Sequence, residues 1–196
     1  MNSPKTRIIL ASSSPYRKEL LSRILEDFET LSPDIDETPF PDEEPIELVS
    51  RLAQQKALAV AVNHPDTLVI GSDQVCVLNN QILGKPGTMD KAIEQLKACS
   101  GQTVTFYTSL CVTSAHETAQ NTTVVATKVQ FRQLSDKEII NYLEKEQPLD
   151  CAGSFKCEGL GIVLFEAIES KDPTALIGLP LIALATKLRE FGVELL

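Results

Sequence analysis

The stretch that most constrains the fold is residues 8–21, where a short apolar run passes through serines into an amphipathic segment. The apolar run is typical of a buried strand. Ser14 followed by Pro15 predicts a helix start, with serine as the N-cap and proline at the first helical position. Unpaired N–H groups at such a start favour an anion, whereas Arg17 and Lys18 in the first turn oppose the helix dipole. The stretch therefore predicts either a phosphate-binding turn or a capped helix with two solvated basic side chains.

Charge and composition narrow the possible partners. The 196 residues carry a formal net charge of −9, which argues against nonspecific binding to nucleic acid or to an anionic membrane. No segment approaches the length of a membrane-spanning helix. Five cysteines without a C-x-x-C pair and two histidines argue against a zinc site. Residues 8–11 are too short for the apolar core of a signal peptide, so we expect a cytoplasmic protein.

Two further segments contain charged residues that a binding site could use. Residues 33–45 are rich in proline and acidic side chains, which predicts a surface loop. In that loop Asp36 and Glu37 are either solvated or available to hold Mg²⁺ beside a phosphate site. Residues 45–62 predict a helix, and Lys56 continues one of its apolar rows at helical spacing. Lys56 therefore either extends to water or points into a site.

A carboxylate interrupts the apolar run over residues 67–78. Residues 67–70 predict a buried strand that presents Gly71 and Asp73 at its C-terminal end. Gly71 allows another segment to approach the backbone closely. An ionised Asp73 in these surroundings needs a cationic partner or a metal, and such an acid at a strand end is typical of a functional site. Lys85 follows in a tight loop.

The order of the expected elements predicts the fold class. Strand–helix units come first, and residues 103–113 and 122–132 then predict two strands of a hairpin. A helix and a glycine-rich connector follow, and a further strand is expected over residues 162–165. This order predicts an α/β protein with a mixed central β-sheet flanked by helices, built as a single domain over residues 1–196.

Three segments together resemble the Maf family of nucleotide pyrophosphatases. They are LASSSPYRKELL at residues 10–21, IGSDQV at residues 70–75 and GKP at residues 84–86. The resemblance spans nearly the whole chain and includes residues 36–39 and 178–181. It implies an elongated α/β fold with a cleft between two lobes. It also implies a cytoplasmic, metal-dependent and usually dimeric enzyme that converts nucleoside triphosphates to the monophosphate and pyrophosphate.

The resemblance implies roles for individual residues. Asp73 corresponds to the catalytic acid and would act as general base for water that attacks between the α- and β-phosphates. Asp73 and Glu37 would hold Mg²⁺ or Mn²⁺. The positions that correspond to phosphate-binding residues, whose cations would neutralise developing charge, are Ser12, Ser14, Arg17, Lys18, Lys56 and Lys85.

The residues around these motifs differ from the pattern of many members. Tyr16 stands where a first arginine is common, Gln74 follows the acid, and Glu158 lies in FKCEG at residues 155–159. This combination resembles the branch that acts on 7-methyl-GTP rather than on dTTP and UTP. A tyrosine face attracts the cationic 7-methylguanine ring, although Tyr16 could instead pack at the helix start. Glu158 could accept hydrogen bonds from the guanine N1–H and amino group.

Other functions stay open. One is a pyrophosphatase for dTTP, UTP or other modified nucleotides, and another is a nucleotide-binding regulator of cell division in which hydrolysis is incidental. A third is a structural α/β domain. A carboxylate beside a phosphate site favours catalysis, because a protein that only binds nucleotides has no use for it. Metal-dependent release of pyrophosphate would separate an enzyme from a regulator.

Overall fold

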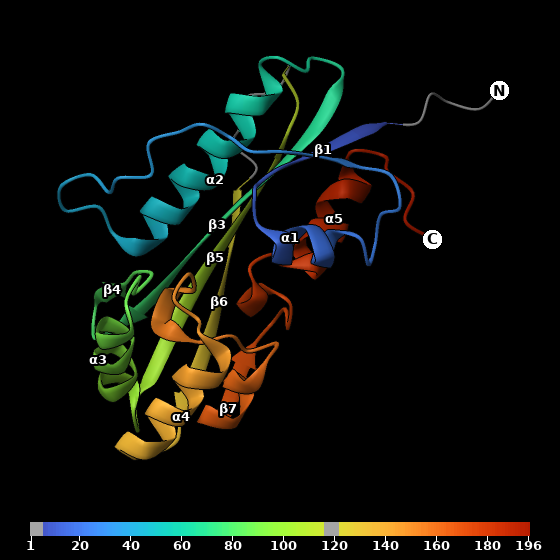
Figure 1. The fold of residues 1–196 in the computed structure, drawn as a ribbon. Helices are drawn as coiled ribbons and strands as arrows, with labels where there is room; N and C mark the ends of the chain where they lie inside the picture. The colour runs from blue at the N-terminus through green and yellow to red at the C-terminus, as the bar shows by residue number, and fades with distance from the viewer. Residues whose placement is uncertain (1–5, 116–121) are drawn as a thin grey trace. The chain divides into compact units, whose positions relative to one another are not determined.

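A mixed β-sheet with the strand order β2-β1-β3-β5-β6-β7 is the central feature of the computed structural model, and β4 pairs with β3 (Figure 1). Strand β1 is parallel to β2 and β3, whereas β4 is antiparallel to β3 and β7 is antiparallel to β6. The prediction of a mixed sheet is confirmed. The strands are β1 (Arg7–Ala11), β2 (Glu29–Leu31), β3 (Thr67–Leu78), β4 (Gln81–Leu83), β5 (Thr103–Thr113), β6 (Thr122–Phe131) and β7 (Phe165–Ser170).

Helices follow most strands, as expected for an α/β protein. The α-helices are α1 (Pro15–Leu21), α2 (Pro45–Ala61), α3 (Met89–Cys99), α4 (Asp136–Glu146) and α5 (Leu181–Glu190). The short 3₁₀ helices are η1 (Ala152–Ser154), η2 (Leu160–Leu164) and η3 (Ala175–Ile177). None of the helices in residues 6–115 and 122–196, the part that the structure describes, is both long and apolar enough to cross a membrane.

The chain divides into two units. The first comprises Met1–Gln74, Thr108–Val125 and Asp172–Leu196, and the second comprises Val75–Tyr107 and Ala126–Lys171. Strands β3, β5 and β6 each contribute residues to both units. The two units are therefore described in turn.

Helices cover both faces of the strands in the first unit (Figure 1). Ile8 and Leu10 of β1 belong to one buried cluster with leucines of α1 and α5. Ile9 and Ala11 belong to a second cluster with small residues of α2. Because successive side chains of a strand point to opposite faces, this alternation places one helix layer on each side.

Gly71 allows α2 to lie directly against β3. A Cβ atom at Gly71 would overlap the carbonyl oxygen of Ala53 and lie 2.9 Å from the backbone nitrogen of Ala57. The close backbone approach predicted at this glycine is confirmed. Its consequence is that Lys56, next to Ala57, lies close to Asp73, two residues after Gly71.

Four phenylalanine rings pack together in the second unit. The Phe155 ring makes edge-to-face contacts with Phe106, Phe131 and Phe165, at centroid distances of 5.3, 5.4 and 4.8 Å. Such edge-to-face pairs add to the stabilisation from apolar burial. Phe155 therefore anchors the start of the segment that leads to Glu158.

Two expectations about strands are wrong. Leu160–Leu164 is a 3₁₀ helix instead of a strand, and β7 begins only at Phe165. About half of the surface of Ile162 and of Val163 is exposed. A short apolar run alone does not distinguish a buried strand from another conformation. Asp73 is also not at a strand end, because β3 continues without a break to Leu78.

Candidate functional site

The turn before α1 is held by two serine hydroxyl groups. Ser12 Oγ accepts a hydrogen bond from the backbone N–H of Ser14 at 3.1 Å. Ser14 Oγ accepts one from the backbone N–H of Arg17 at 3.4 Å, and Pro15 occupies the first turn of the helix. The predicted N-cap is confirmed. Lys18 on the same helix is exposed.

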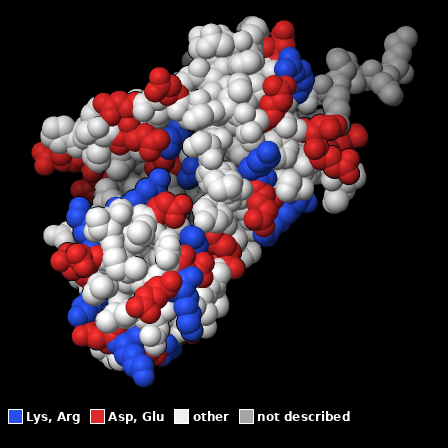
Figure 2. All heavy atoms as spheres, in the orientation of Figure 1, with Lys and Arg blue, Asp and Glu red and all other residues white. Residues whose placement is uncertain are grey.

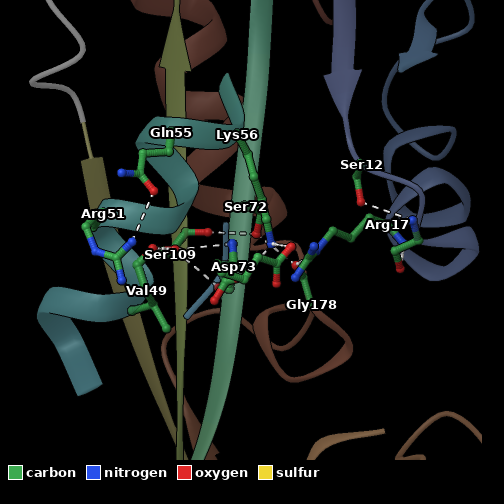
Figure 3. A network of polar contacts seen from close by, with 12 residues as sticks. Ser12, Arg17, Val49, Arg51, Gln55, Lys56, Ser72, Asp73, Ser109 and Gly178 are labelled. Carbon is green, nitrogen blue, oxygen red and sulfur yellow. Dashed lines mark hydrogen bonds and ion pairs between the residues drawn. The ribbon is translucent and has the colours of Figure 1, made fainter. Parts of the chain in front are cut away.

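The Arg17 side chain is fixed by a backbone carbonyl group of a distant segment. Its Nε donates to the oxygen of Gly178 at 2.8 Å, and Ser72 Oγ donates to the same oxygen at 3.0 Å. Burial lowers the pKa of the Arg17 guanidinium, against the opposite influence of the Asp73 and Glu37 carboxylates. The Arg17 guanidinium group remains charged despite this burial, because the pKa of arginine is normally far above neutral pH. Figure 3 shows this side chain extending from α1 toward Asp73.

Lys56 forms ion pairs with both candidate metal ligands. Its Nζ lies 2.6 Å from Asp73 Oδ1 and 2.9 Å from Glu37 Oε1. The exposed fraction of the side chain is 7% for Lys56 and 9% for Asp73, but 58% for Glu37. Of the two alternatives for Lys56, the structure therefore shows a side chain that points into the site.

Ser109 supports the backbone of Asp73 from the neighbouring strand. Its Oγ accepts from the Asp73 N–H at 3.2 Å and donates to the carbonyl oxygen of Val49 at 2.6 Å. This one hydroxyl group therefore joins β3, β5 and α2 (Figure 3). Sequence reasoning missed Ser109, although two polar residues at the start of an apolar run, Thr108 and Ser109, were an available signal.

Gln74 is tied to the segment that leads to Gly178. Its Nε2 donates to Thr108 Oγ1 at 2.8 Å, and it also contacts the carbonyl oxygens of Ala175 at 2.8 Å and Leu176 at 3.1 Å. The amide nitrogen therefore fixes the local path of the backbone that holds Arg17. A contact with a nucleobase would have to involve the carbonyl end of the Gln74 amide.

The donor set at Asp73 and Glu37 fits a metal ion that is shared with a substrate. Both carboxylates contact the Lys56 ammonium group, so their oxygen atoms lie close enough to share one cation. Mg²⁺ is commonly held by one or two carboxylates together with phosphate oxygens and water. Within residues 6–115 and 122–196, no group of three or more His, Cys, Asp or Glu side chains could hold a metal. A metal held by the two carboxylates would have further coordination positions for phosphate oxygens and water.

Two predicted site residues, Lys85 and Glu158, belong to the second unit. Both are exposed. The turn that carries Glu158 is held by α4 at both of its ends, because Lys156 N–H donates to Tyr142 Oη at 3.0 Å and Leu160 N–H donates to Glu146 Oε2 at 2.8 Å. Sequence reasoning did not identify these two hydrogen bonds.

The structure thus brings Arg17, Lys56, Asp73 and Glu37 together in the first unit, on α1, α2, β3 and the acidic loop. Tyr16 is half-buried at the start of α1, next in sequence to Arg17. The arrangement combines two fixed cations with a buried carboxylate, which is suited to binding a polyanion and accepting a proton beside it.

Comparison with known proteins identifies relatives over nearly the full length of the chain. Residues 7–191 match the family model described as Maf-like protein. The chain is 53% identical over 192 residues to a 7-methyl-GTP pyrophosphatase of Aliivibrio fischeri, covering 98% of this chain and all of the relative. It is 54% identical over 189 residues to a 7-methyl-GTP pyrophosphatase of Nitrosococcus oceani, covering 96% of this chain and 95% of the relative.

A solved structure supports the fold. The HAM1 protein from Coxiella burnetii superimposes with a TM-score of 0.50 over 95% of this chain and 98% of that one. The sequences are 15% identical, so the likeness concerns the fold alone.

Proposed function

The chain belongs to the Maf family, and from this premise we propose that it hydrolyses 7-methyl-GTP to 7-methyl-GMP and pyrophosphate. The observation that carries the reaction is the buried Asp73 carboxylate, paired with Lys56 at 2.6 Å and facing Arg17. The substrate is supported by the two relatives above, which act on 7-methyl-GTP by name and match nearly the whole chain.

In this reaction water adds to the α-phosphorus, and the bond from that phosphorus to the α–β bridging oxygen breaks. Asp73 accepts the proton of the water at a carboxylate oxygen, and pyrophosphate leaves. Lys56 and Arg17 bind the phosphate oxygens and stabilise the charge that develops on them. Because both cations are already held in the folded protein, they need little reorganisation when the reaction occurs.

The proposed cofactor is Mg²⁺ or Mn²⁺, held by Asp73 and Glu37. When bound, it would neutralise negative charge on the phosphate groups. The support for it is the convergence of both carboxylates on the one Lys56 ammonium group. Further phosphate contacts are proposed for Ser12, Ser14, Lys18 and Lys85.

Recognition of the base is proposed for Tyr16, Gln74 and Glu158. The 7-methylguanine ring is cationic, and an aromatic face attracts a stacked cation. A carboxylate accepts hydrogen bonds from the guanine N1–H and amino group, and neither thymine nor uracil offers this pair of donors. The two backbone hydrogen bonds from α4 to the Glu158 turn support this role, because they restrict where the carboxylate can lie.

The test is pyrophosphate release with Mg²⁺ or Mn²⁺ from 7-methyl-GTP, GTP, dTTP and UTP. We expect the native protein to prefer 7-methyl-GTP. Glu158→Ala should lose about 5- to 150-fold of kcat/KM for 7-methyl-GTP, since a good bidentate base contact contributes about 1–3 kcal/mol. Glu144→Ala, which removes an exposed carboxylate from α4, is the matched control and should behave like the native protein.

Asp73→Asn should abolish turnover and still bind the nucleotide. Full activity of this variant would exclude Asp73 as the base. Preference for dTTP or UTP would support a pyrophosphatase but exclude 7-methyl-GTP as its preferred substrate. Tight nucleotide binding without metal-dependent pyrophosphate release would favour a regulator.

We also propose a cytoplasmic homodimer without nucleic-acid or membrane partners. The dimer is supported by the family resemblance, and light scattering tests it. The five cysteines are all free, which fits a reducing compartment. Figure 2 shows acidic and basic side chains interspersed over the visible face, and the net charge is −9, so the charge pattern does not favour a nucleic-acid polymer.

A further inference from the structure

We propose that Arg51 and Glu43 form a clamp that positions Glu37 for binding of the divalent metal. The proposal rests on the proposed function, in which Glu37 is a metal ligand. Glu37 lies between β2 and α2 in a segment without helix or strand, and 58% of its side chain is exposed. A side chain in such a segment keeps a defined position only if neighbouring residues are held.

The clamp is a forked ion pair. Arg51 Nε lies 2.6 Å from Glu43 Oε1, and Arg51 Nη2 lies 2.7 Å from Glu43 Oε2. Only 16% of the Arg51 side chain and 7% of the Glu43 side chain are exposed. Two parallel hydrogen bonds fix the plane of the guanidinium group as well as its position. Arg51 therefore attaches the end of the acidic loop to α2 in one orientation.

The same guanidinium group also holds the middle of the loop. Arg51 Nη2 donates to the carbonyl oxygen of Thr38 at 3.1 Å, and Arg51 Cζ lies 4.0 Å from the centroid of the Phe40 ring. Glu43 Oε2 accepts from the Phe40 N–H at 3.0 Å. The residue directly after Glu37 is thus bound to the helix.

The residue before Glu37 is restrained as well. Asp36 Oδ1 accepts from the Thr38 N–H at 2.9 Å, which closes a local turn around Glu37. Lys56, which meets the Glu37 carboxylate, lies on the same helix as Arg51. Helix α2 therefore holds both the backbone beside Glu37 and the ammonium group that the carboxylate contacts.

Arg51 is a positioning residue and not a catalytic one. Within residues 6–115 and 122–196, the side chain of Arg51 donates hydrogen bonds to loop residues and to Gln55, one helical turn further along α2 (Figure 3). Arg51→Met removes the clamp, whereas Arg51→Lys keeps a charge and loses the fork. Arg7→Met is the matched control in the same unit, because it breaks an exposed pair with Glu29.

The first readout is hydrogen exchange of the Thr38 and Phe40 amides in the metal-free protein, measured by mass spectrometry. We expect exchange in Arg51→Met at least tenfold faster than in the native protein and in Arg7→Met. The second readout is the Kd for Mn²⁺, measured by electron paramagnetic resonance. Loss of a residue that orients a metal ligand typically weakens binding about 10- to 100-fold, so we expect at least a tenfold rise in Arg51→Met.

A double variant separates positioning from a general structural effect. If Arg51 acts through Glu37, Arg51→Met combined with Glu37→Gln should bind Mn²⁺ no more weakly than Glu37→Gln alone. Arg51→Lys should be intermediate, and it serves as the test variant if Arg51→Met does not fold. The proposal would be overturned if the two substitutions weaken Mn²⁺ binding independently, so that their fold-changes in Kd multiply in the double variant. Unchanged hydrogen exchange or unchanged Mn²⁺ affinity in Arg51→Met would also overturn it, as would no Mn²⁺ binding by the native protein.

Neither readout requires hydrolysis. If hydrogen exchange and the Kd for Mn²⁺ change as expected and no nucleotide is hydrolysed, the role of the clamp is supported and the proposed function is wrong. If 7-methyl-GTP is hydrolysed and Arg51→Met changes neither readout, the proposed function stands and the clamp fails.

Discussion

Removal of the Lys56 ammonium group should destabilise the metal-free protein strongly. The pair with Asp73 is 2.6 Å long, and less than a tenth of each side chain is exposed. Removing one partner of a buried ion pair costs about 3–5 kcal/mol, because it leaves an uncompensated charge. The pair with the mostly exposed Glu37 adds only about 0–1 kcal/mol. Arg17 remains near Asp73 and offsets part of the loss, so we expect about 3 kcal/mol for Lys56→Met.

The assay is urea and thermal unfolding in the presence of EDTA. For a chain of this length, about 3 kcal/mol corresponds to a melting temperature roughly 6–12 °C lower. Asp73→Asn should cost a similar amount, and the double variant should cost less than either single variant because neither charge is left without its partner. Lys97→Met, which breaks an exposed pair with Asp136, should cost less than about 1 kcal/mol. Additive losses of about 6 kcal/mol in the double variant would refute the reasoning.

Three further predictions concern packing and titration. Gly71→Ala should lower the free energy of unfolding by about 1–3 kcal/mol through overlap with α2, whereas Gly84→Ala, with open space around it, should not; thermal unfolding compares them. Gly159→Ala places a Cβ 2.8 Å from Oε1 of Glu146, the residue that holds the turn of Glu158. Kinetic measurements should therefore show a lower preference for 7-methyl-GTP over GTP. Unfolding measurements should show a change in stability of less than about 1 kcal/mol. Burial raises the pKa of Cys99 to about 12 and that of Cys111 to about 11. A thiol-specific reagent at pH 8 should therefore label both cysteines only after unfolding. As the pH rises, the thiols lose their protons in the unfolded chain at a lower pH than in the folded protein. The urea midpoint should therefore fall as the pH rises from about 9 to 11.

The parts of the site that depend on neighbouring residues in sequence were predictable. Ser14 and Pro15 mark the start of α1 because an N-cap and a first-turn proline act within a few residues. A close approach of another segment to Gly71 followed from the absence of a side chain in an otherwise bulky strand, although the identity of that segment, α2, did not. Both expectations rested on properties of single residues, and the structure confirms both.

The parts that depend on tertiary contacts were not predictable from pattern. The helical spacing of Lys56 fits extension to water as well as burial, and only the contact of α2 with β3 decides between them. Asp73 was placed at a strand end because a charge normally interrupts a buried strand. The strand continues because Lys56 pairs with the carboxylate and Ser109 satisfies the backbone N–H, and both partners come from distant segments.

An acidic chain can bind a polyanion only if its cations are concentrated and held at one place. Arg17 is fixed by the Gly178 carbonyl oxygen and Lys56 by two carboxylates, so folding has already oriented both groups. Lys18 is exposed on α1, and within residues 6–115 and 122–196 no ion pair holds its ammonium group, so its charge is screened by water and salt. Fixed donors can stabilise a transition state without reorganisation, whereas a mobile surface charge acts mainly on the rate of encounter. If the proposed hydrolysis is correct, Arg17 and Lys56 should therefore influence kcat, and Lys18 should influence kcat/KM in a way that weakens with ionic strength.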